Sequence, residues 1–325
     1  MPVAISASLD GSEPPGEVRR LAQVADAGGA DTLWIACHLF RRDPVALAAA
    51  ALTATPRLGV ALMALSPYAV HPVYAAMAAA TLDEMFPGRV QLCLGVGAPR
   101  DLAAAGIEAP RPVATLTEAI AIARALLAGE TVAFAGERFR VEGRCLASGA
   151  RPVPIALAAS GPRMLELAGK AADSVLISSA SAPEFVGWCL DHVRRGEAAT
   201  ERKVRRIGLV AAALDDGVQR GHARVRRNLA YVLRGAHHAR NLALAGSALD
   251  QAALHGAYAR EDWAAVDTLM TDDVVGRHAA CGSVDEVSGR LARYHAAGLD
   301  EIVLAGVGDA AMLQRLLAVC RPNGP

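Results

Sequence analysis

The sequence predicts an α/β protein of the (β/α)8 TIM-barrel class, with insertions after the fourth and seventh strands. Short apolar runs alternate with longer helical patterns, as in parallel α/β folds. Most of these runs are hydrophobic on both faces, as strands covered on both sides require. Eight such runs in 325 residues match the eight units of a barrel. An open doubly wound sheet has the same periodicity and stays open as the alternative.

Helical patterns fill the gaps between the predicted strands. The first strand is followed by EVRRLAQVADAG, which ends at the turn Gly28-Gly29, because glycine tolerates the conformation that ends a helix. The second and third strands are followed by VALAAAALTA and PVYAAMAAATLDEM. We expect the eight strands at residues 3–8, 32–36, 58–64, 90–95, 153–159, 174–178, 207–214 and 301–306.

The two insertions differ in character. Residues 99–152 contain a helical pattern, TEAIAIARALLAG, and a predicted hairpin, TVAFAGERFRV. Residues 215–297 are predicted to be helical and are rich in arginine and histidine. Because no repeat or Pro/Ser-rich linker marks a boundary, we expect one domain over residues 1–325.

Composition excludes several classes of function. The chain is 53% hydrophobic, so it is not disordered, and 33 basic residues balance 33 acidic ones. That balance argues against nucleic-acid binding and against a polybasic membrane patch. The six cysteines form no C-x-x-C pair, and neither a secretory signal nor a membrane-spanning run is evident. We therefore expect a cytoplasmic protein with no metal site.

Lysine chemistry is also disfavoured. The chain has two lysines, Lys170 and Lys203, and neither lies in a P-loop motif. A barrel lysine that forms a Schiff base should lie at the C-terminal end of a strand, whereas Lys170 lies in a helical pattern and Lys203 in a charged run.

Four stretches together resemble the luciferase-like monooxygenase family, which includes deazaflavin-dependent reductases. They are SPYAVHP (66–72), ATLDEMFPGRVQLCLGVGAP (80–99), EAIAIARALLAGETVAFAGERFRV (118–141) and VPIALAASGPRMLELAGKAADSVLISS (153–179). Their order and spacing match the family as well. The resemblance implies a TIM barrel that binds FMN or the deazaflavin coenzyme F420 at the C-terminal ends of its strands.

The resemblance also implies where the phosphate of the cofactor binds. Ala159, Ser160, Gly161 and Pro162 lead from the fifth strand into a helix, where free N–H groups favour an anion. Ser178 and Ser179 end the sixth strand and supply further donors. A plain helix cap, however, would use the same residues at 159–162.

The flavin ring is expected against the end of the third strand. Members of the family have a non-proline cis peptide there, and the matching bond is Ala61–Leu62, with Met63–Ala64 as the alternative. Gly97 belongs to the turn Gly95-Val96-Gly97 that follows the fourth strand. An ordinary buried strand would also explain the apolar residues.

His38 is the candidate catalytic residue. It follows the second strand, and a neutral imidazole there can exchange a proton with a substrate near the flavin. Many relatives have a carboxylate before this histidine, whereas this chain has Cys37. We therefore expect His38 to have no neighbouring carboxylate.

Other positions also depart from the family or suggest a ligand. Val70 stands where arginine is common, and Ser6 stands where some methylene-pterin reductases have glutamate. His237-His238 is expected in a solvated insertion rather than at a metal. The candidates to meet an anionic cofactor tail are Arg100, Arg163 and Arg277.

The resemblance implies an oxidoreductase that acts on a small organic substrate, by hydride transfer with F420 or by monooxygenation with FMN. A non-catalytic flavin-binding protein of the same fold is the alternative, because charged residues are missing at positions 6, 37 and 70. A barrel hydrolase or lyase is disfavoured, because neither a G-x-S-x-G motif nor a metal triad appears. The alanine-rich helices and the family predict a homodimer or a larger homo-oligomer.

Overall fold

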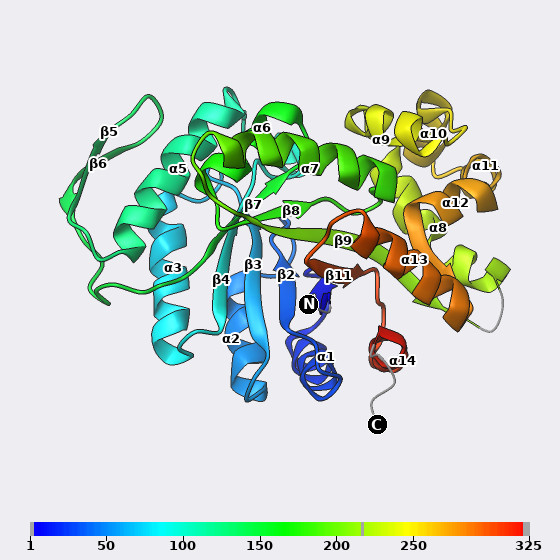
Figure 1. Cartoon of the computed structure of the whole chain (residues 1–325), viewed down its shortest axis with the longest axis horizontal. Coiled ribbons are helices and arrows are strands. Elements are labelled where there is room, and N and C mark those ends of the chain that lie inside the picture. Colours follow the sequence, from blue (N-terminus) through cyan, green and yellow to red (C-terminus); the bar gives the residue numbers. More distant parts are fainter. Residues whose placement is uncertain (1–2, 216–217, 321–325) are drawn as a thin grey trace. The chain divides into compact units, whose positions relative to one another are not determined.

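Each of the eight predicted apolar runs forms a strand in the computed structural model, which describes residues 3–215 and 218–320 (Figure 1). Their bounds differ from the prediction by at most two residues. The eight are β1 (Ala4–Leu9), β2 (Thr32–Ala36), β3 (Gly59–Leu65), β4 (Val90–Leu94), β7 (Ile155–Ala159), β8 (Ser174–Ile177), β9 (Arg205–Leu214) and β11 (Glu301–Ala305).

The first seven helices all begin at a proline. Proline at the first helical position loses nothing, because the N–H that it lacks would have no partner there, and its fixed φ suits the helix. These helices are α1 (Pro15–Ala27), α2 (Pro44–Ala54), α3 (Pro72–Met85), α4 (Pro99–Ala104), α5 (Pro112–Leu127), α6 (Pro162–Ala171) and α7 (Pro183–Ala198).

The chain folds as two units, which we name after their strands. The β2–β7 unit comprises residues 9–176 and 192–205, and the β9–β11 unit comprises the described residues of 1–8, 177–191 and 206–325. The prediction of a single domain concerns how the two units are joined and stays a prediction.

In the β2–β7 unit, β2, β3, β4 and β7 pair in parallel in that order. The β2–β3 register is regular from Thr32 opposite Gly59 to Ala36 opposite Met63. Helices α1 and α2 pack against each other, as do α3 and α5. Small alanine side chains allow this close approach, and α2 buries Ala48 and Ala51 completely.

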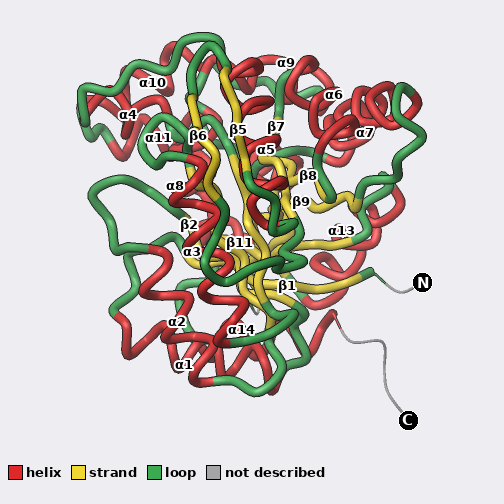
Figure 2. Tube along the Cα trace, turned by 90° about the vertical axis from the view of Figure 1, so that its left-hand side faces the viewer, coloured by secondary structure: helices red, strands yellow, loops and turns green. Residues whose placement is uncertain are grey.

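The predicted hairpin forms β5 (Val132–Ala135) and β6 (Arg140–Arg144), a separate two-stranded antiparallel sheet (Figure 2). Glu118 of α5 holds the turn of this hairpin. Its carboxylate accepts hydrogen bonds from the backbone N–H groups of Glu137, Arg138 and Phe139, at 2.8, 3.0 and 3.0 Å. Burial acts to raise the pKa of Glu118, but these three bonds hold it below its ordinary value.

In the β9–β11 unit, β1 pairs with β11, β11 with β9, and β9 with a further strand, β10 (Ala279–Gly282), all in parallel. The sequence did not predict β10, because AACG lacks the β-branched and aromatic residues that mark strands. The predicted helical insertion is otherwise confirmed. Its elements are α8 (Val218–Leu233), a 3₁₀ turn (Ala236–His238), α9 (Ala239–Ala245), α10 (Gln251–Ala259), α11 (Trp263–Leu269), α12 (Asp272–His278) and α13 (Val284–Ala296), and α14 (Ala310–Cys320) follows β11.

The insertion packs a buried apolar core against β9 rather than lying solvated on the surface. Leu229 and Leu233 of α8, Leu254 of α10 and Val274 and Val275 of α12 belong to one buried apolar cluster. His238 is also buried, and burial lowers its pKa to about 3, with the charges of two further histidines acting in the same direction. The expectation of a solvated pair at 237–238 is therefore wrong for His238, while His237 is exposed.

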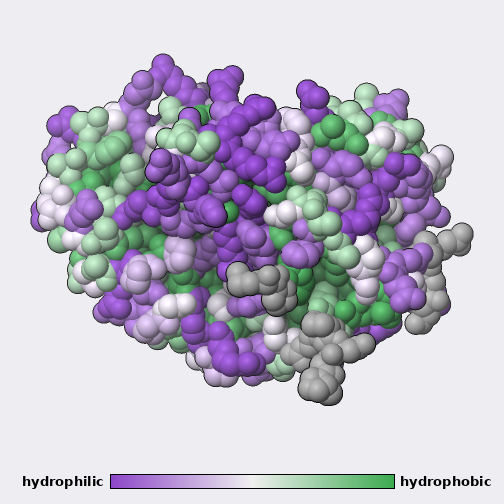
Figure 3. All heavy atoms as spheres, viewed as in Figure 1, coloured by the Kyte–Doolittle hydropathy of each residue, from purple (hydrophilic) through white to green (hydrophobic). Residues whose placement is uncertain are grey.

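The surface is mixed in character. Over the described part of the chain, no helix is both long and apolar enough to cross a bilayer. On the face drawn in Figure 3, hydrophobic and hydrophilic residues are intermingled. Three large apolar side chains of α3 are nevertheless exposed: Tyr74 by 50%, Met77 by 46% and Met85 by 58%.

Candidate active site

The C-terminal ends of β2, β3, β4 and β7 lie at one edge of the sheet, because the four strands are parallel. In (β/α)8 barrels this edge carries the active site. His38 follows β2, Ser66 follows β3, Gly95 and Gly97 follow β4, and Ser160 follows β7. The sequence therefore places its candidate residues of this unit at the edge where barrel chemistry takes place.

His38 lies beside a carboxylate that the sequence analysis missed. Its Nδ1 is 3.1 Å from Oδ2 of Asp101, and the exposed fractions of the two side chains are 35% and 20%. The expectation that His38 has no neighbouring carboxylate is wrong. Asp101 lies in the first turn of α4, a short helix that was not predicted, and that helix brings it to the residue following β2. The available signal was an acidic residue in the loop region after the fourth strand, since the parallel strands of one sheet all end at the same edge.

This pairing defines the proton chemistry of His38. A carboxylate at Nδ1 accepts the Nδ1–H of the neutral imidazole, which leaves Nε2 unprotonated and able to accept a proton. The same carboxylate stabilises the imidazolium that forms afterwards. An oriented histidine of this kind is the usual form of a general base or acid in enzymes.

Cys37 is not an alternative general base or nucleophile at this position. Its thiol is partly buried, and burial raises its pKa to about 11, with the charges of Asp43 and Asp101 acting in the same direction. The thiol thus stays protonated at neutral pH and is a poor nucleophile. Its backbone N–H donates to the carbonyl oxygen of Met63 at 2.5 Å, which ties the end of β2 to that of β3.

The cis peptide of β3 is Met63–Ala64. The preferred position in the sequence, Ala61–Leu62, is therefore wrong, and the alternative is correct. Ala61 and Leu62 are completely buried and pair regularly with β2 and β4, so they belong to the core. The register with β4 shifts only after Leu62, and Met63 and Ala64 are partly exposed.

Small residues lie together at the ends of β3, β4 and β7. A Cβ on Gly95 would lie 3.0 Å from Cβ of Ala64 and 3.2 Å from Cβ of Ala158, so any larger residue there would push these neighbours apart. Gly97 has a φ of +94°, and a Cβ there would lie 3.1 Å from Cβ of Ser66. Gly95 itself is buried, while the small residues Ala64 and Ala158 beside it are partly exposed.

The expected phosphate segment begins α6. Ala159 is buried at the end of β7, Ser160 is partly exposed, and Gly161 and Pro162 are exposed. No side chain caps the helix. Gly161 has a φ of −96° and a Cβ there would meet no atom within 4 Å, so the fold does not require glycine at this position. An exposed, uncapped helix start with accessible backbone suits an anion.

Ser178 and Ser179 belong to the β9–β11 unit, in the loop between β8 and α7. Both are partly exposed. The carbonyl oxygen of Ser178 accepts a hydrogen bond from the Ser181 hydroxyl at 2.8 Å. Their role in binding phosphate stays a prediction.

The structure gives two of the other candidate residues a different environment from the one expected. Ser6 donates its hydroxyl to the buried carboxylate of Glu301 at 2.6 Å, so a carboxylate does lie beside this position, supplied by β11. Arg277 donates to Asp273 at 2.7 Å and to the carbonyl oxygen of Ala245 at 2.7 Å, so its guanidinium supports α12. Arg100 and Arg163 are exposed at the starts of α4 and α6.

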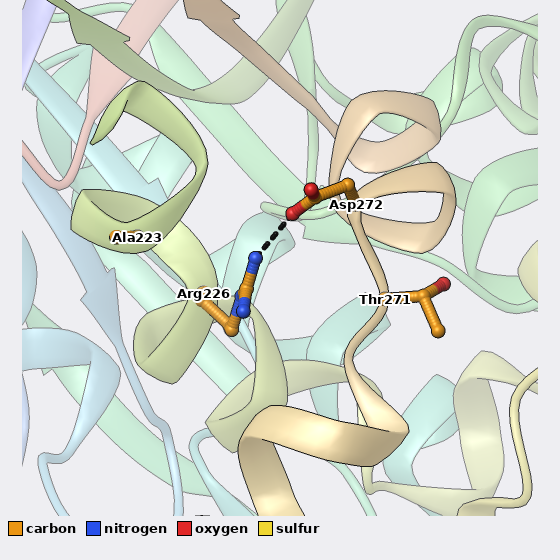
Figure 4. Close-up of a pocket in the computed structure, with 4 residues that line it drawn as sticks. All are labelled: Ala223, Arg226, Thr271 and Asp272. Carbon is orange, nitrogen blue, oxygen red and sulfur yellow. Dashed lines mark hydrogen bonds and ion pairs between the residues drawn. The ribbon is translucent and has the colours of Figure 1, made fainter. Parts of the chain in front are cut away.

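A hollow of about 480 Å³ lies elsewhere, in the β9–β11 unit (Figure 4). Ala223 and Arg226 of α8 line it together with Thr271 and Asp272, where α12 begins. Arg226 and Asp272 form an ion pair, so their opposite charges neutralise each other. None of the residues predicted for the cofactor lines this hollow, and among the described residues no three metal-binding side chains come together.

The comparisons with known proteins identify the family. The luciferase-like monooxygenase family matches residues 1–301. This chain belongs to that family. It is 28% identical over 299 residues to a 5,10-methylenetetrahydromethanopterin reductase of Methanolobus tindarius, an alignment that covers 90% of each chain.

Solved structures confirm the predicted (β/α)8 fold. The coenzyme F420-dependent tetrahydromethanopterin reductase of Methanopyrus kandleri matches with a TM-score of 0.89 and 19% identity, over 98% of this chain and 97% of that one. The oxygenating constituent of 3,6-diketocamphane monooxygenase from Pseudomonas putida, solved with FMN, matches with a TM-score of 0.71 and 16% identity, over 98% and 97%. The same fold therefore occurs in a protein described as coenzyme F420-dependent and in one solved with FMN.

Proposed function

We propose that this luciferase-like oxidoreductase uses coenzyme F420 to transfer a hydride to or from a small organic substrate, with His38 and Asp101 handling the accompanying proton. The observation that carries the proposal is the 3.1 Å contact between Nδ1 of His38 and Oδ2 of Asp101 at the C-terminal edge of the strands. The reductase from Methanolobus tindarius, which aligns over nine-tenths of the chain, supports hydride transfer.

The local structure fits a flavin or a deazaflavin. The small, partly exposed residues Ala64 and Ala158 at the strand ends suit contact with a planar ring, and the uncapped start of α6 offers backbone to an anion. When bound, the cofactor supplies the hydride chemistry, which no amino-acid side chain provides. The residues of the chain bind and orient the cofactor and move the proton.

In the proposed mechanism, Asp101 orients the imidazole so that Nε2 of His38 can take a proton from a substrate hydroxyl during oxidation. In the reverse direction the imidazolium returns that proton to the developing oxygen. The carboxylate stabilises the charged imidazole in both directions. Cys37 stays protonated and excludes a second charge from this position.

Monooxygenation with FMN is the second candidate, favoured by the FMN complex with the same fold. A non-catalytic flavin-binding protein is less favoured than the sequence suggested. Positions 37 and 6 have no carboxylate of their own, but Asp101 supplies one beside His38 and Glu301 supplies one beside Ser6.

Titration of the purified protein with F420 and with FMN tests the proposal. We expect saturable quenching of F420 fluorescence and, with a working substrate, a change in F420 absorbance that consumes no oxygen. Tight binding of FMN together with substrate-dependent oxygen consumption would favour the monooxygenase instead. If neither cofactor binds, the proposed function is wrong.

We further propose a cytoplasmic location and assembly as a homodimer or a larger homo-oligomer, with a small molecule as the substrate. The exposed apolar residues Tyr74, Met77 and Met85 of α3 support the assembly, since large apolar side chains exposed on one helix often mark contacts between subunits.

A further inference from the structure

The loop after β8 has an unusual backbone. Ala180 is completely buried and has a φ of +61°, the left-handed region that favours glycine. This conformation is strained for a non-glycine residue, and it persists only where the surroundings impose it. Ser178 and Ser179 immediately precede this residue and are partly exposed.

Side chains of the insertion hold this backbone in place. The carbonyl oxygen of Ala180 accepts hydrogen bonds from Nδ2 of Asn241 at 2.7 Å and from Nδ1 of His278 at 2.8 Å. The amide of Asn241 also accepts, through Oδ1, from the backbone N–H of Ala182 at 2.9 Å. Asn241 thus bridges the two peptides on either side of Ser181.

Two further contacts complete the set. The hydroxyl of Tyr294 donates to the carbonyl oxygen of Ser181 at 2.9 Å, and burial raises the pKa of this tyrosine to about 12, so it remains a donor. Because Nδ1 of His278 donates to a carbonyl, its Nε2 accepts in the neutral ring, and the Ser247 hydroxyl lies 2.8 Å from it. These contacts fix the tautomer of His278.

The polar side chains in this network are expensive to bury. Asn241 and His278 are completely inaccessible to solvent, and burial lowers the pKa of His278 to about 4. A buried polar group is costly unless it is fully hydrogen-bonded, and glycine at position 180 would reach the same backbone without this network. The chain instead uses three helices, α9, α12 and α13, to define one peptide next to two partly exposed serines.

We infer that Asn241 and His278 are positioning residues that hold Ser178 and Ser179 in the orientation in which they contact the phosphate of the cofactor. This inference rests on the proposed function. Neither positioning residue touches the cofactor. Each fixes the Ala180 peptide, which sets the direction of the two preceding residues.

Two substitutions of His278 separate positioning from general stability. His278→Asn places an amide nitrogen close to the position of Nδ1 and keeps the bond to Ala180. His278→Gln extends toward the position of Nε2, keeps the contact with Ser247, and loses the bond to Ala180. Both remove the imidazole and leave the same apolar neighbours, so they are matched controls for each other.

The readout is selectivity for phosphate, measured by fluorescence titration with FMN and with riboflavin, which lacks the phosphate. F420 and its phosphate-free deazaflavin core form a second pair. In the wild type the phosphorylated form should bind more tightly in at least one pair. His278→Gln should lower this preference about tenfold, whereas His278→Asn should stay within about threefold of the wild type. A purely structural role would lower the melting temperature in both variants and leave the preference unchanged.

Tyr294→Phe provides a test that does not depend on the histidine variants folding. It removes the donor to Ser181 and keeps the ring, and the phosphate preference should fall about threefold. If the wild type binds a cofactor with no preference for phosphate, or if His278→Gln and Tyr294→Phe keep the wild-type preference, the inference is wrong. If the wild type binds neither FMN nor F420, both the inference and the proposed function fail.

Discussion

Replacing Asp101 by asparagine tests the proton chemistry directly. The Asp101→Asn substitution keeps the size of the side chain and removes its charge, and the new amide can donate to Nδ1 and so favour the opposite tautomer of His38. The exposed control is Glu108→Gln, which removes a carboxylate seven residues later in the same unit. The fold should survive both substitutions, since Asp101 is partly exposed on a helix of six residues.

The size of the effect follows from the contact distance and the exposure. A full imidazolium–carboxylate pair at 3.1 Å has an energy of roughly 5 kcal/mol at an effective dielectric constant of about 20, and roughly 1 kcal/mol in bulk water. The side chains of His38 and Asp101 are 35% and 20% exposed, which places the pair between these limits. We take about 2.7 kcal/mol, which corresponds to about a hundredfold loss of kcat.

The assay is turnover of a working substrate followed by cofactor absorbance, together with cofactor affinity by titration. Asp101→Asn and His38→Asn should each lower kcat about a hundredfold and change the cofactor dissociation constant less than about threefold. Because the two residues act as a unit, the double variant should lose little more than either single variant. Unchanged kcat in Asp101→Asn, or a double variant whose loss is the product of the two single losses, would refute the reasoning.

Four further predictions concern the rest of the structure. Gly161→Val should weaken binding of the cofactor about tenfold without lowering the melting temperature, because its Cβ meets open space, and an unchanged affinity would remove the phosphate from this position. Glu118→Ala should lower the free energy of unfolding by roughly 1–3 kcal/mol and speed amide hydrogen exchange at the hairpin turn, because it removes the acceptor of three backbone N–H groups. Glu118→Gln keeps an acceptor and should lose less stability. Equal exchange rates in the wild type and both variants would contradict this prediction. Burial lowers the pKa of His278 from 6.5 to about 4, so the unfolded chain binds a proton at this residue before the folded chain does as the pH falls. The free energy of unfolding should therefore fall by about 2 kcal/mol between pH 7 and pH 5. Urea unfolding should show this loss in the wild type and a smaller loss in His278→Asn. Met77→Glu should convert a dimer into a monomer by light scattering, and a wild-type monomer at micromolar concentration would exclude assembly through α3.

The fold could be predicted from the sequence because its signals are local. Apolar runs and the prolines and glycines between them define strands and helix starts, as at Pro44 and Pro72, where the expected helices begin within one residue. The prediction missed β10, whose small residues form a strand only because β9 is beside them. It also missed the burial of His238, which depends on the packing of the insertion helices rather than on the residue itself.

The candidate site was predicted only in part, for a related reason. His38 and Gly97 lie at the expected strand ends, since a strand ends where the local pattern does. The position of the cis peptide depends on where the β3–β4 register shifts, which is a property of two strands together.

Positions 37 and 6, where this chain lacks the carboxylate of its relatives, show how far residue identity alone can mislead. Cys37 and Ser6 suggested a site that had lost its charges, because each stands where relatives have a carboxylate. In the structure Asp101 reaches His38 from α4, and Glu301 reaches Ser6 from β11. A carboxylate that orients a proton-transferring histidine has to lie at hydrogen-bonding distance from its ring, but it can come from any place in the chain. The His38–Asp101 pair joins two segments that are 63 residues apart, and the proposed proton transfer therefore depends on how loops meet at the edge of the sheet rather than on the residue next to His38 in the sequence.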